Sequence, residues 1–164
     1  MLPAVRVGVI AVTWVAIQIG SGFIAHRIPL SWFQKERFLF RTRRFERGGA
    51  FYRRVFRIHR WKRLLPEAGA TFSGGFAKRS LAGAGPDYLK RFVAETRRAE
   101  LTHWLPLLFS LTFFLWNPPE VAVWMPLFAL VVNAPFIMVQ RNNRPRLQRA
   151  AREVAQHFTR PQSP

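Results

Sequence analysis

The strongest constraint on this chain is that its apolar and charged residues occupy separate stretches. Three apolar runs cover residues 3–24, 104–116 and 121–139, and Arg6 is the one charged residue inside them. A helix needs about 20 apolar residues to cross the hydrocarbon core of a bilayer. The first and third runs, with 22 and 19 residues, have about that length. The sequence therefore predicts a membrane protein.

The chain as a whole is strongly basic, with 26 Lys and Arg against 8 Asp and Glu, and all of these except Arg6 lie outside the apolar runs. A basic nucleic-acid-binding domain would contain fewer long apolar runs, and a disordered tail would lack these 16 Phe, 6 Trp and 2 Tyr residues. We therefore expect no nucleic-acid partner. The absence of cysteine excludes disulfides and thiolate ligands, and the four histidines show no metal-site spacing, so we expect no metal.

The middle apolar run is too short to cross a bilayer alone. Its 13 residues would form a helix about 20 Å long, whereas the hydrocarbon core is about 30 Å thick. We expect the helix to begin near residue 99, which places Glu100 and His103 at the level of the lipid. The predicted fold is all-α, a single polytopic membrane domain over residues 1–164 with transmembrane helices at 3–24, 99–116 and 121–139.

The distribution of Lys and Arg predicts the orientation of these helices. Residues 25–44 and 140–160 contain six each, whereas the turn at 117–120 contains none. Cytoplasmic flanks of membrane helices are enriched in Lys and Arg. We therefore expect residues 25–98 and the tail 140–164 to be cytoplasmic, with the N-terminus outside the cell membrane. A cleaved signal peptide is the alternative for the first run, but that run is too long and lacks a clear cleavage site.

Aromatic residues alternate with arginines in the predicted loop at 25–98. Phe51, Val55, Ile58 and Leu65 can line one side of a helix. Basic amphipathic helices of this kind suit the lipid headgroup layer. Proteins that bind single-stranded nucleic acid use the same residue types, but the flanking apolar runs favour membrane lipids as the partner. The glycine-rich residues 67–86 are predicted to form an ordered loop.

Glu100 and His103 form the candidate catalytic pair. They are three residues apart and therefore project from one face of a helix. A carboxylate beside an imidazole can orient the ring and stabilise its protonated form, as in a general base that acts on a hydroxyl. A polar pair at the interface, anchored by Trp104, fits the same spacing equally well. The sequence contains no nucleophile-elbow or phosphate-loop motif.

The third run ends in "VVNAPFIMVQRNNRPRL", residues 131–147. Asn133 would lie about two helical turns inside the membrane, where it either satisfies backbone groups freed by Pro135 or contacts a polar group of a substrate. Arg141, Arg144 and Arg146 would emerge at the cytoplasmic surface. There they could bind phosphate through the forked guanidinium, or lipid headgroups.

Several blocks of the sequence carry a family resemblance: "RIP" at 27–29, "FERGGAF" at 45–51, "RWK" at 60–62, "ETRRAELTHW" at 95–104 and "NAPFIMVQRNNRPRL" at 133–147. In these blocks the chain resembles the glycosyl-4,4'-diaponeurosporenoate acyltransferase family, the membrane enzymes of the last step of staphyloxanthin biosynthesis. The resemblance implies transfer of a fatty acyl group from a cytoplasmic thioester donor, acyl-CoA or acyl-ACP, to a sugar hydroxyl of a glycosylated carotenoid acid. It implies no further cofactor.

Within that reaction, we expect His103, oriented by Glu100, to deprotonate the acceptor hydroxyl. We expect Asn133 or Gln140 to donate to the developing oxyanion. The residues predicted to hold the donor's phosphates are Arg60, Lys62, Arg141, Arg144 and Arg146. The other predicted substrate-binding residues are Trp61, Glu95, Arg98, Trp104 and Asn143. A non-catalytic adaptor that binds anionic lipid or partner proteins through its basic loop is the alternative, and the oligomeric state is left open.

Overall fold

The structure, a computed structural model, describes residues 3–65 and 85–159. Within these residues every regular element is a helix and no strand occurs, which confirms the predicted all-α class. The long helices are α1 (Pro3–Arg27), α5 (Pro86–Phe109) and α7 (Trp124–Thr159). The short elements, in chain order, are α2 (Leu30–Gln34), η1 (Phe38–Phe40), η2 (Arg44–Gly49), α3 (Ala50–Arg54), α4 (Ile58–Trp61), η3 (Lys62–Leu64), η5 (Ser110–Leu115) and α6 (Pro119–Ala122).

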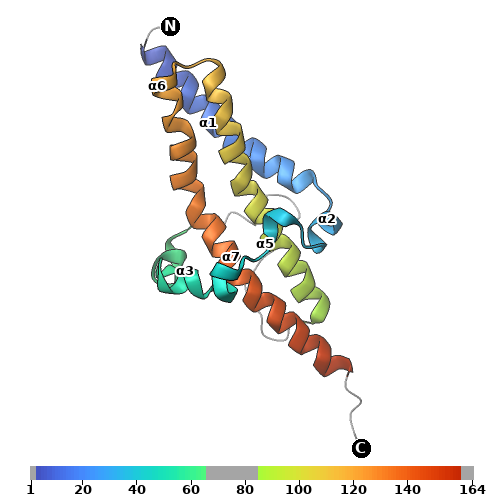
Figure 1. Cartoon of the computed structure of the whole chain (residues 1–164). Helices are drawn as coiled ribbons and strands as arrows, with labels where there is room; N and C mark the ends of the chain where they lie inside the picture. Colours follow the sequence, from blue (N-terminus) through green and yellow to red (C-terminus); the bar gives the residue numbers. More distant parts are fainter. Residues whose placement is uncertain (1–2, 66–84, 160–164) are drawn as a thin grey trace, which may run out of the picture.

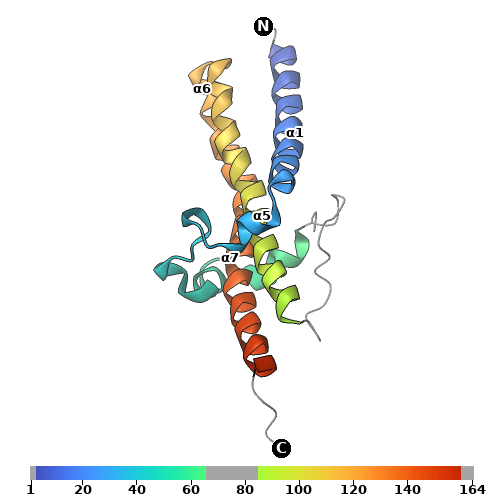
Figure 2. The ribbon, with the colours of Figure 1, turned by 90° about the vertical axis from the view of Figure 1, so that its right-hand side faces the viewer.

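The molecule is elongated, and the long helices run roughly along its length (Figures 1 and 2). Helices α5 and α7 form the most extensive packing interface, and α1 packs against α5. The start of α1 and α6 lie at one end, and the end of α7 lies at the other (Figure 1). We call α1 with residues 104–139 the apolar half, and residues 28–65, 86–103 and 140–159 the charged half.

Two helical segments are long and apolar enough to cross a membrane by length and composition, Pro3–Arg27 and Pro119–Gln156. Their most apolar windows are only 17% and 22% buried within the molecule, so neither is the covered core helix of a water-soluble domain. Large apolar side chains in them, such as Val12 and Val131, instead face outward. This pattern is compatible with membrane association.

The third predicted crossing does not appear as a separate apolar helix in the described residues. Helix α5 begins with Pro86 in its first turn and carries its charged residues and its apolar residues in one continuous element. Proline suits a helix start because its missing N–H would have no partner there. Since charged side chains fill the first half of α5, the structure yields two clear spanning candidates where the sequence predicted three.

Helix α7 extends beyond the run predicted at 121–139. It continues through Pro135 and Pro145 to Thr159, so most of the predicted tail is helix. Residues 160–164 lie outside the described residues. Because α7 packs on α5 over this extension, the tail contributes to the fold.

The basic segment after α1 folds as short pieces. Phe33 and Phe40 pack with Ala94 in a buried cluster that attaches this segment to α5. The single amphipathic helix predicted around residues 51–65 is wrong, because Arg57 adopts a left-handed conformation (φ 47°) that separates α3 from α4. Ile58 is consequently buried while Val55 is exposed. The predicted loop at 67–86 lies outside the described residues except for Gly85 and Pro86.

Candidate functional site

A buried carboxylate marks the level at which α5 changes from charged to apolar. Glu100 is fully buried. Its Oε1 accepts hydrogen bonds from Arg141 Nε at 2.7 Å and from Trp104 Nε1 at 3.1 Å. Its Oε2 accepts a hydrogen bond from Arg144 Nη2. Both oxygens are therefore held by groups that are fixed on α5 and α7.

The arginines that bind Glu100 use their remaining donors inside the protein. Arg141 donates from Nη1 to Glu46 Oε1 at 2.5 Å and from Nη2 to the Leu39 carbonyl at 2.6 Å. Arg144 donates to the Thr96 hydroxyl at 3.0 Å and carbonyl at 3.2 Å, and to the Phe40 carbonyl at 2.8 Å. The prediction that Arg141 and Arg144 hold the donor's phosphates conflicts with this geometry, because their guanidinium groups are already bound and almost fully buried.

Glu46 completes an ion cluster that we define as Glu46, Glu100, Arg141 and Arg144. Glu46 is buried, and it accepts hydrogen bonds from the Tyr52 hydroxyl at 2.8 Å and the Arg43 backbone N–H at 3.1 Å. Burial and the neighbouring carboxylate raise the pKa of Tyr52, so the phenol stays protonated and donates. Two carboxylates balance two guanidinium groups, which allows the cluster to be buried without net charge.

A tight turn after Glu46 positions its side chain in this cluster. Gly48 and Gly49 have φ values of 62° and 89°, in the left-handed region that glycine adopts without strain. A Cβ on Gly49 would lie 2.8 Å from the backbone oxygen of Asn142, so only glycine permits this approach to α7. Arg53 Nη1 then donates to Asn142 Oδ1 at 3.3 Å. The turn thereby holds η2 and α3 against α7.

His103 lies beside this cluster but has a different partner. Its Nδ1 is 3.0 Å from Asn133 Oδ1, and the Asn133 amide donates from Nδ2 to the Ala129 carbonyl at 2.9 Å. Because the Ala129 carbonyl can only accept, it orients the amide so that Oδ1 faces the ring. Nδ1 must then carry the proton, which leaves the lone pair of neutral imidazole on Nε2. The ring also stacks on Phe136 at 4.5 Å between centroids.

The expected contact between Glu100 and His103 is therefore replaced by two separate arrangements. Glu100 is bonded to Arg141, Arg144 and Trp104, while His103 is oriented by Asn133 from α7. A spacing of three residues puts both side chains on neighbouring positions of α5, but the partners on α7 determine which way each one turns. The catalytic roles assigned to Glu100 and His103 stay predictions.

The other predicted residues fall into distinct places. Glu95 pairs with Arg98 at 3.1 Å, and Arg98 also donates to the Ile28 carbonyl at 3.3 Å, which ties α5 to the end of α1. Asn143 accepts a hydrogen bond from Asn142 at 3.1 Å. The remaining predicted residues are Arg60 and Arg146, which are exposed, and Trp61, Lys62 and Gln140, which are half-buried.

Sequence reasoning missed Glu46 and Tyr52. The available signal was that Glu46 is the only acidic residue between Glu36 and Glu67, in a segment otherwise rich in arginine. An isolated acid among many bases favours an internal ion pair. Among the described residues, no group of three or more His, Cys, Asp or Glu could hold a metal ion.

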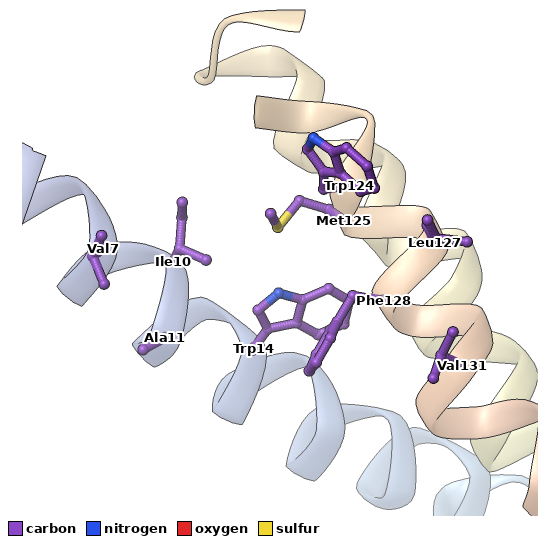
Figure 3. A pocket seen from close by; sticks show the side chains of 9 residues that line it. All are labelled: Val7, Ile10, Ala11, Trp14, Trp124, Met125, Leu127, Phe128 and Val131. Atoms are coloured by element: carbon purple, nitrogen blue, oxygen red, sulfur yellow. The ribbon is translucent and has the colours of Figure 1, made fainter. Parts of the chain in front are cut away.

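The apolar half contains a groove of about 730 Å³ between α1 and α7 (Figure 3). Trp14 of α1 stacks on Phe113 of η5 at 5.2 Å and contacts Phe128 of α7 edge-on at 5.0 Å, both between ring centroids. The residues that line the groove are Val7, Ile10, Ala11, Trp14, Trp124, Met125, Leu127, Phe128 and Val131.

Comparisons with known proteins point to one family. The family profile described as "Glycosyl-4,4'-diaponeurosporenoate acyltransferase" matches residues 29–153. A protein of that name from Staphylococcus aureus (strain MRSA252) is 31% identical over 140 residues, which cover 85% of this chain and 84% of the relative. Its counterparts in strains bovine RF122 / ET3-1 and USA300 are 30% identical with the same coverage. No solved structure matches this chain.

Proposed function

The chain belongs to the glycosyl-4,4'-diaponeurosporenoate acyltransferase family and is an acyltransferase, and we propose that it moves a fatty acyl group from a thioester donor to a sugar hydroxyl of a glycosylated carotenoid or related glycolipid. The observation that carries the proposed mechanism is the His103–Asn133 pair. The His103 imidazole has a fixed tautomer and is half-buried next to the apolar half. These are the properties required of a general base that acts on a membrane-bound hydroxyl.

In the proposed reaction, His103 Nε2 takes the proton of the acceptor hydroxyl as its oxygen attacks the thioester carbonyl carbon. The new C–O bond forms, the C–S bond breaks, and the protonated imidazole returns the proton to the departing thiolate. Asn133 is the positioning residue, because it accepts the Nδ1 hydrogen bond in both protonation states of the ring. The acyl group passes directly to the acceptor, and the chain contains no cysteine that could carry it.

The developing oxyanion requires a donor near His103. Both polar atoms of the Asn133 side chain are already bound, one to His103 and the other to Ala129. Gln140, which is half-buried and follows Phe136 by one turn of α7, is the better candidate for that donor.

We propose acyl-CoA or acyl-ACP as the donor, with no further cofactor. Both donors carry phosphate groups, which guanidinium binds through a forked pair of hydrogen bonds. Because Arg141 and Arg144 serve the ion cluster, the exposed Arg60 and Arg146 and the half-buried Lys62 take this role in the proposal. Arg149 and Arg152 are exposed on α7 and extend the basic surface.

The proposed membrane arrangement has three crossings, formed by α1, the second half of α5 with η5, and the first half of α7. The N-terminus and α6 lie outside the cell, and the charged half faces the cytoplasm. This arrangement agrees with the excess of Lys and Arg in the charged half and with their absence from residues 117–120.

The segment containing η1, η2, α3 and α4 rests on the inner lipid surface in this proposal. Phe38 is 78% exposed and Leu64 is 82% exposed, although both are large apolar side chains. Arg43 lies 4.3 Å from the Phe38 ring centroid. Arginine next to exposed aromatic residues suits the boundary between headgroups and acyl chains.

Reconstitution tests the proposed function. Purified protein in liposomes receives glycosyl-4,4'-diaponeurosporenoate with either acyl-CoA or acyl-ACP, and the lipids are analysed by mass spectrometry. We expect a product heavier by one acyl group in place of a hydroxyl hydrogen. In the host, deletion of the gene should leave a lipid lighter by one acyl group. Two results together would overturn the proposal: the folded protein acylates the acceptor neither with acyl-CoA nor with acyl-ACP, and the deletion strain has an unchanged lipid profile.

A further inference from the structure

We propose that the groove between α1 and α7 binds the polyene chain of the acceptor, an inference that rests on the proposed function. The nine residues that line the groove carry no charged side chain, and most of them are aliphatic or aromatic. A sugar or phosphate headgroup would find no charged partner there, whereas a hydrocarbon chain needs none.

The groove runs along both helices. It follows α1 from Val7 to Trp14 and α7 from Trp124 to Val131, so each wall extends about 10 Å along its helix. Figure 3 shows the Trp14 and Phe128 rings close together between the two helices. Their edge-to-face contact, with ring centroids 5.0 Å apart, bridges α1 and α7 within the groove.

One end of the groove is near the level of the His103–Asn133 pair. Val131 precedes Asn133 by two residues on α7, a rise of about 3 Å along the helix axis. A substrate with its sugar at the level of His103 would thus have its chain at the level of the groove. The groove and the pair lie on different sides of α7, so the chain would pass around Phe128 and Trp14 to reach both.

The lining favours the acceptor's polyene over the donor's acyl chain. Trp14, Trp124 and Phe128 present flat ring faces, which suit a flat conjugated chain. A rigid polyene also loses less conformational entropy on binding than a flexible acyl chain does. The acceptor, being membrane-embedded, reaches the apolar half without leaving the lipid. Acyl chains of ordinary lipids are the competing occupant.

Filling the groove tests this inference. Ala11→Trp places a large ring inside it and removes no existing contact, because Ala11 lines the groove as the smallest residue there. Val12→Trp is the matched control, since Val12 is adjacent on α1, 70% exposed and not part of the lining. Steady-state acylation is measured with glycosyl-4,4'-diaponeurosporenoate and with methyl glucoside, which has no chain.

We expect Ala11→Trp to raise KM for the long-chain acceptor at least tenfold and to leave KM for the donor and the rate with methyl glucoside unchanged. Val12→Trp should leave all of these values within twofold of the original. Equal kinetics in the two variants would overturn the inference, whether both are impaired or neither is.

A binding measurement separates this inference from the proposed function. The absorption band of glycosyl-4,4'-diaponeurosporenoate is titrated with protein in nanodiscs without any donor, which gives a Kd in the absence of turnover. We expect Ala11→Trp to weaken binding tenfold relative to Val12→Trp. Binding with this difference but no acylation would contradict the proposed function alone, whereas acylation with equal Kd values would contradict the groove assignment alone.

Discussion

The two halves of the molecule place charged and apolar side chains in opposite ways. In the charged half, Glu46, Glu100 and Arg144 are almost fully buried; Arg141 and Arg144 both bond to Glu100, and Arg141 also bonds to Glu46. In the apolar half, the most apolar windows of the spanning candidates are only 17% and 22% buried. Charged side chains are thus buried where the surface is basic, and apolar side chains are exposed where charged residues are few.

This difference shows what each half requires from its surroundings. The charged half satisfies its buried ions internally and exposes arginines, so it tolerates water and headgroups. The apolar half leaves large side chains uncovered, which is compatible with lipid around it. In the proposed reaction, His103 lies on the boundary between the halves, where a water-soluble donor and a lipid-soluble acceptor can meet.

The largest expected effect concerns chemistry at this boundary. His103→Ala should reduce acyl transfer by about 10²–10⁴-fold, the usual contribution of a general base. Product formation is followed by mass spectrometry in liposomes. His59→Ala, which removes an exposed histidine of the charged half, should leave the rate unchanged. A His103→Ala variant with an undiminished rate would leave the imidazole with a structural role only.

The next effect concerns stability of the charged half. Glu100→Ala leaves Arg141 and Arg144 without their shared carboxylate, which should lower the free energy of unfolding by about 3–5 kcal/mol. Urea unfolding in detergent micelles measures the loss. Glu120→Ala removes an exposed carboxylate from the apolar half and should change stability little. Equal stability of the two variants would contradict the importance of the ion cluster.

Asn133→Ala should have an effect on rate of roughly 10²-fold or less, because it misplaces the imidazole without removing it. Loss of the fixed tautomer should lower kcat more than it raises KM for either substrate. Asn133→Asp retains an acceptor for Nδ1 and should recover part of the rate, which a purely structural role would not explain. If Asn133→Asp were no better than Asn133→Ala, the positioning role would be wrong.

The smallest expected effect is a difference in stability between substitutions at two glycines. Gly49→Ala forces a Cβ against the Asn142 backbone at a left-handed position, so it should destabilise by more than about 1 kcal/mol. Gly20 lies in α1 with nothing within 4 Å of its added Cβ, so Gly20→Ala should stabilise by up to about 1 kcal/mol through helix propensity. Thermal unfolding of both variants in micelles tests this contrast. A shift of Tm in the same direction in both variants would contradict it.

Local patterns predicted the elements but not the partners of the key side chains. The apolar runs predicted α1 and the first part of α7, because length and absence of charge determine them directly. Glu100 and His103 were recognised from their position at the change of polarity. Their separate partners were not, since Arg141 and Asn133 lie 41 and 30 residues away and only tertiary packing selects them.

The arginines illustrate the same limit. Arg141 and Arg144 were predicted as phosphate ligands because arginines after an apolar run usually face water. Their burial depends on η1 and η2, which cover them with the Leu39 and Phe40 carbonyls and with Glu46. That cover depends in turn on Gly49, whose left-handed turn no periodicity in the sequence could predict.

Side-specific cysteine labelling tests most directly whether the apolar half crosses the membrane and leaves the charged half in the cytoplasm. The chain has no cysteine, so each single-cysteine variant has one labelling site. Glu120→Cys, in α6, and Arg152→Cys, near the end of α7, are treated with a membrane-impermeant maleimide in intact cells. We expect Glu120→Cys to react at once and Arg152→Cys to react only after permeabilisation. Reaction of Arg152→Cys in intact cells, or protection of Glu120→Cys until permeabilisation, would contradict the proposed membrane arrangement.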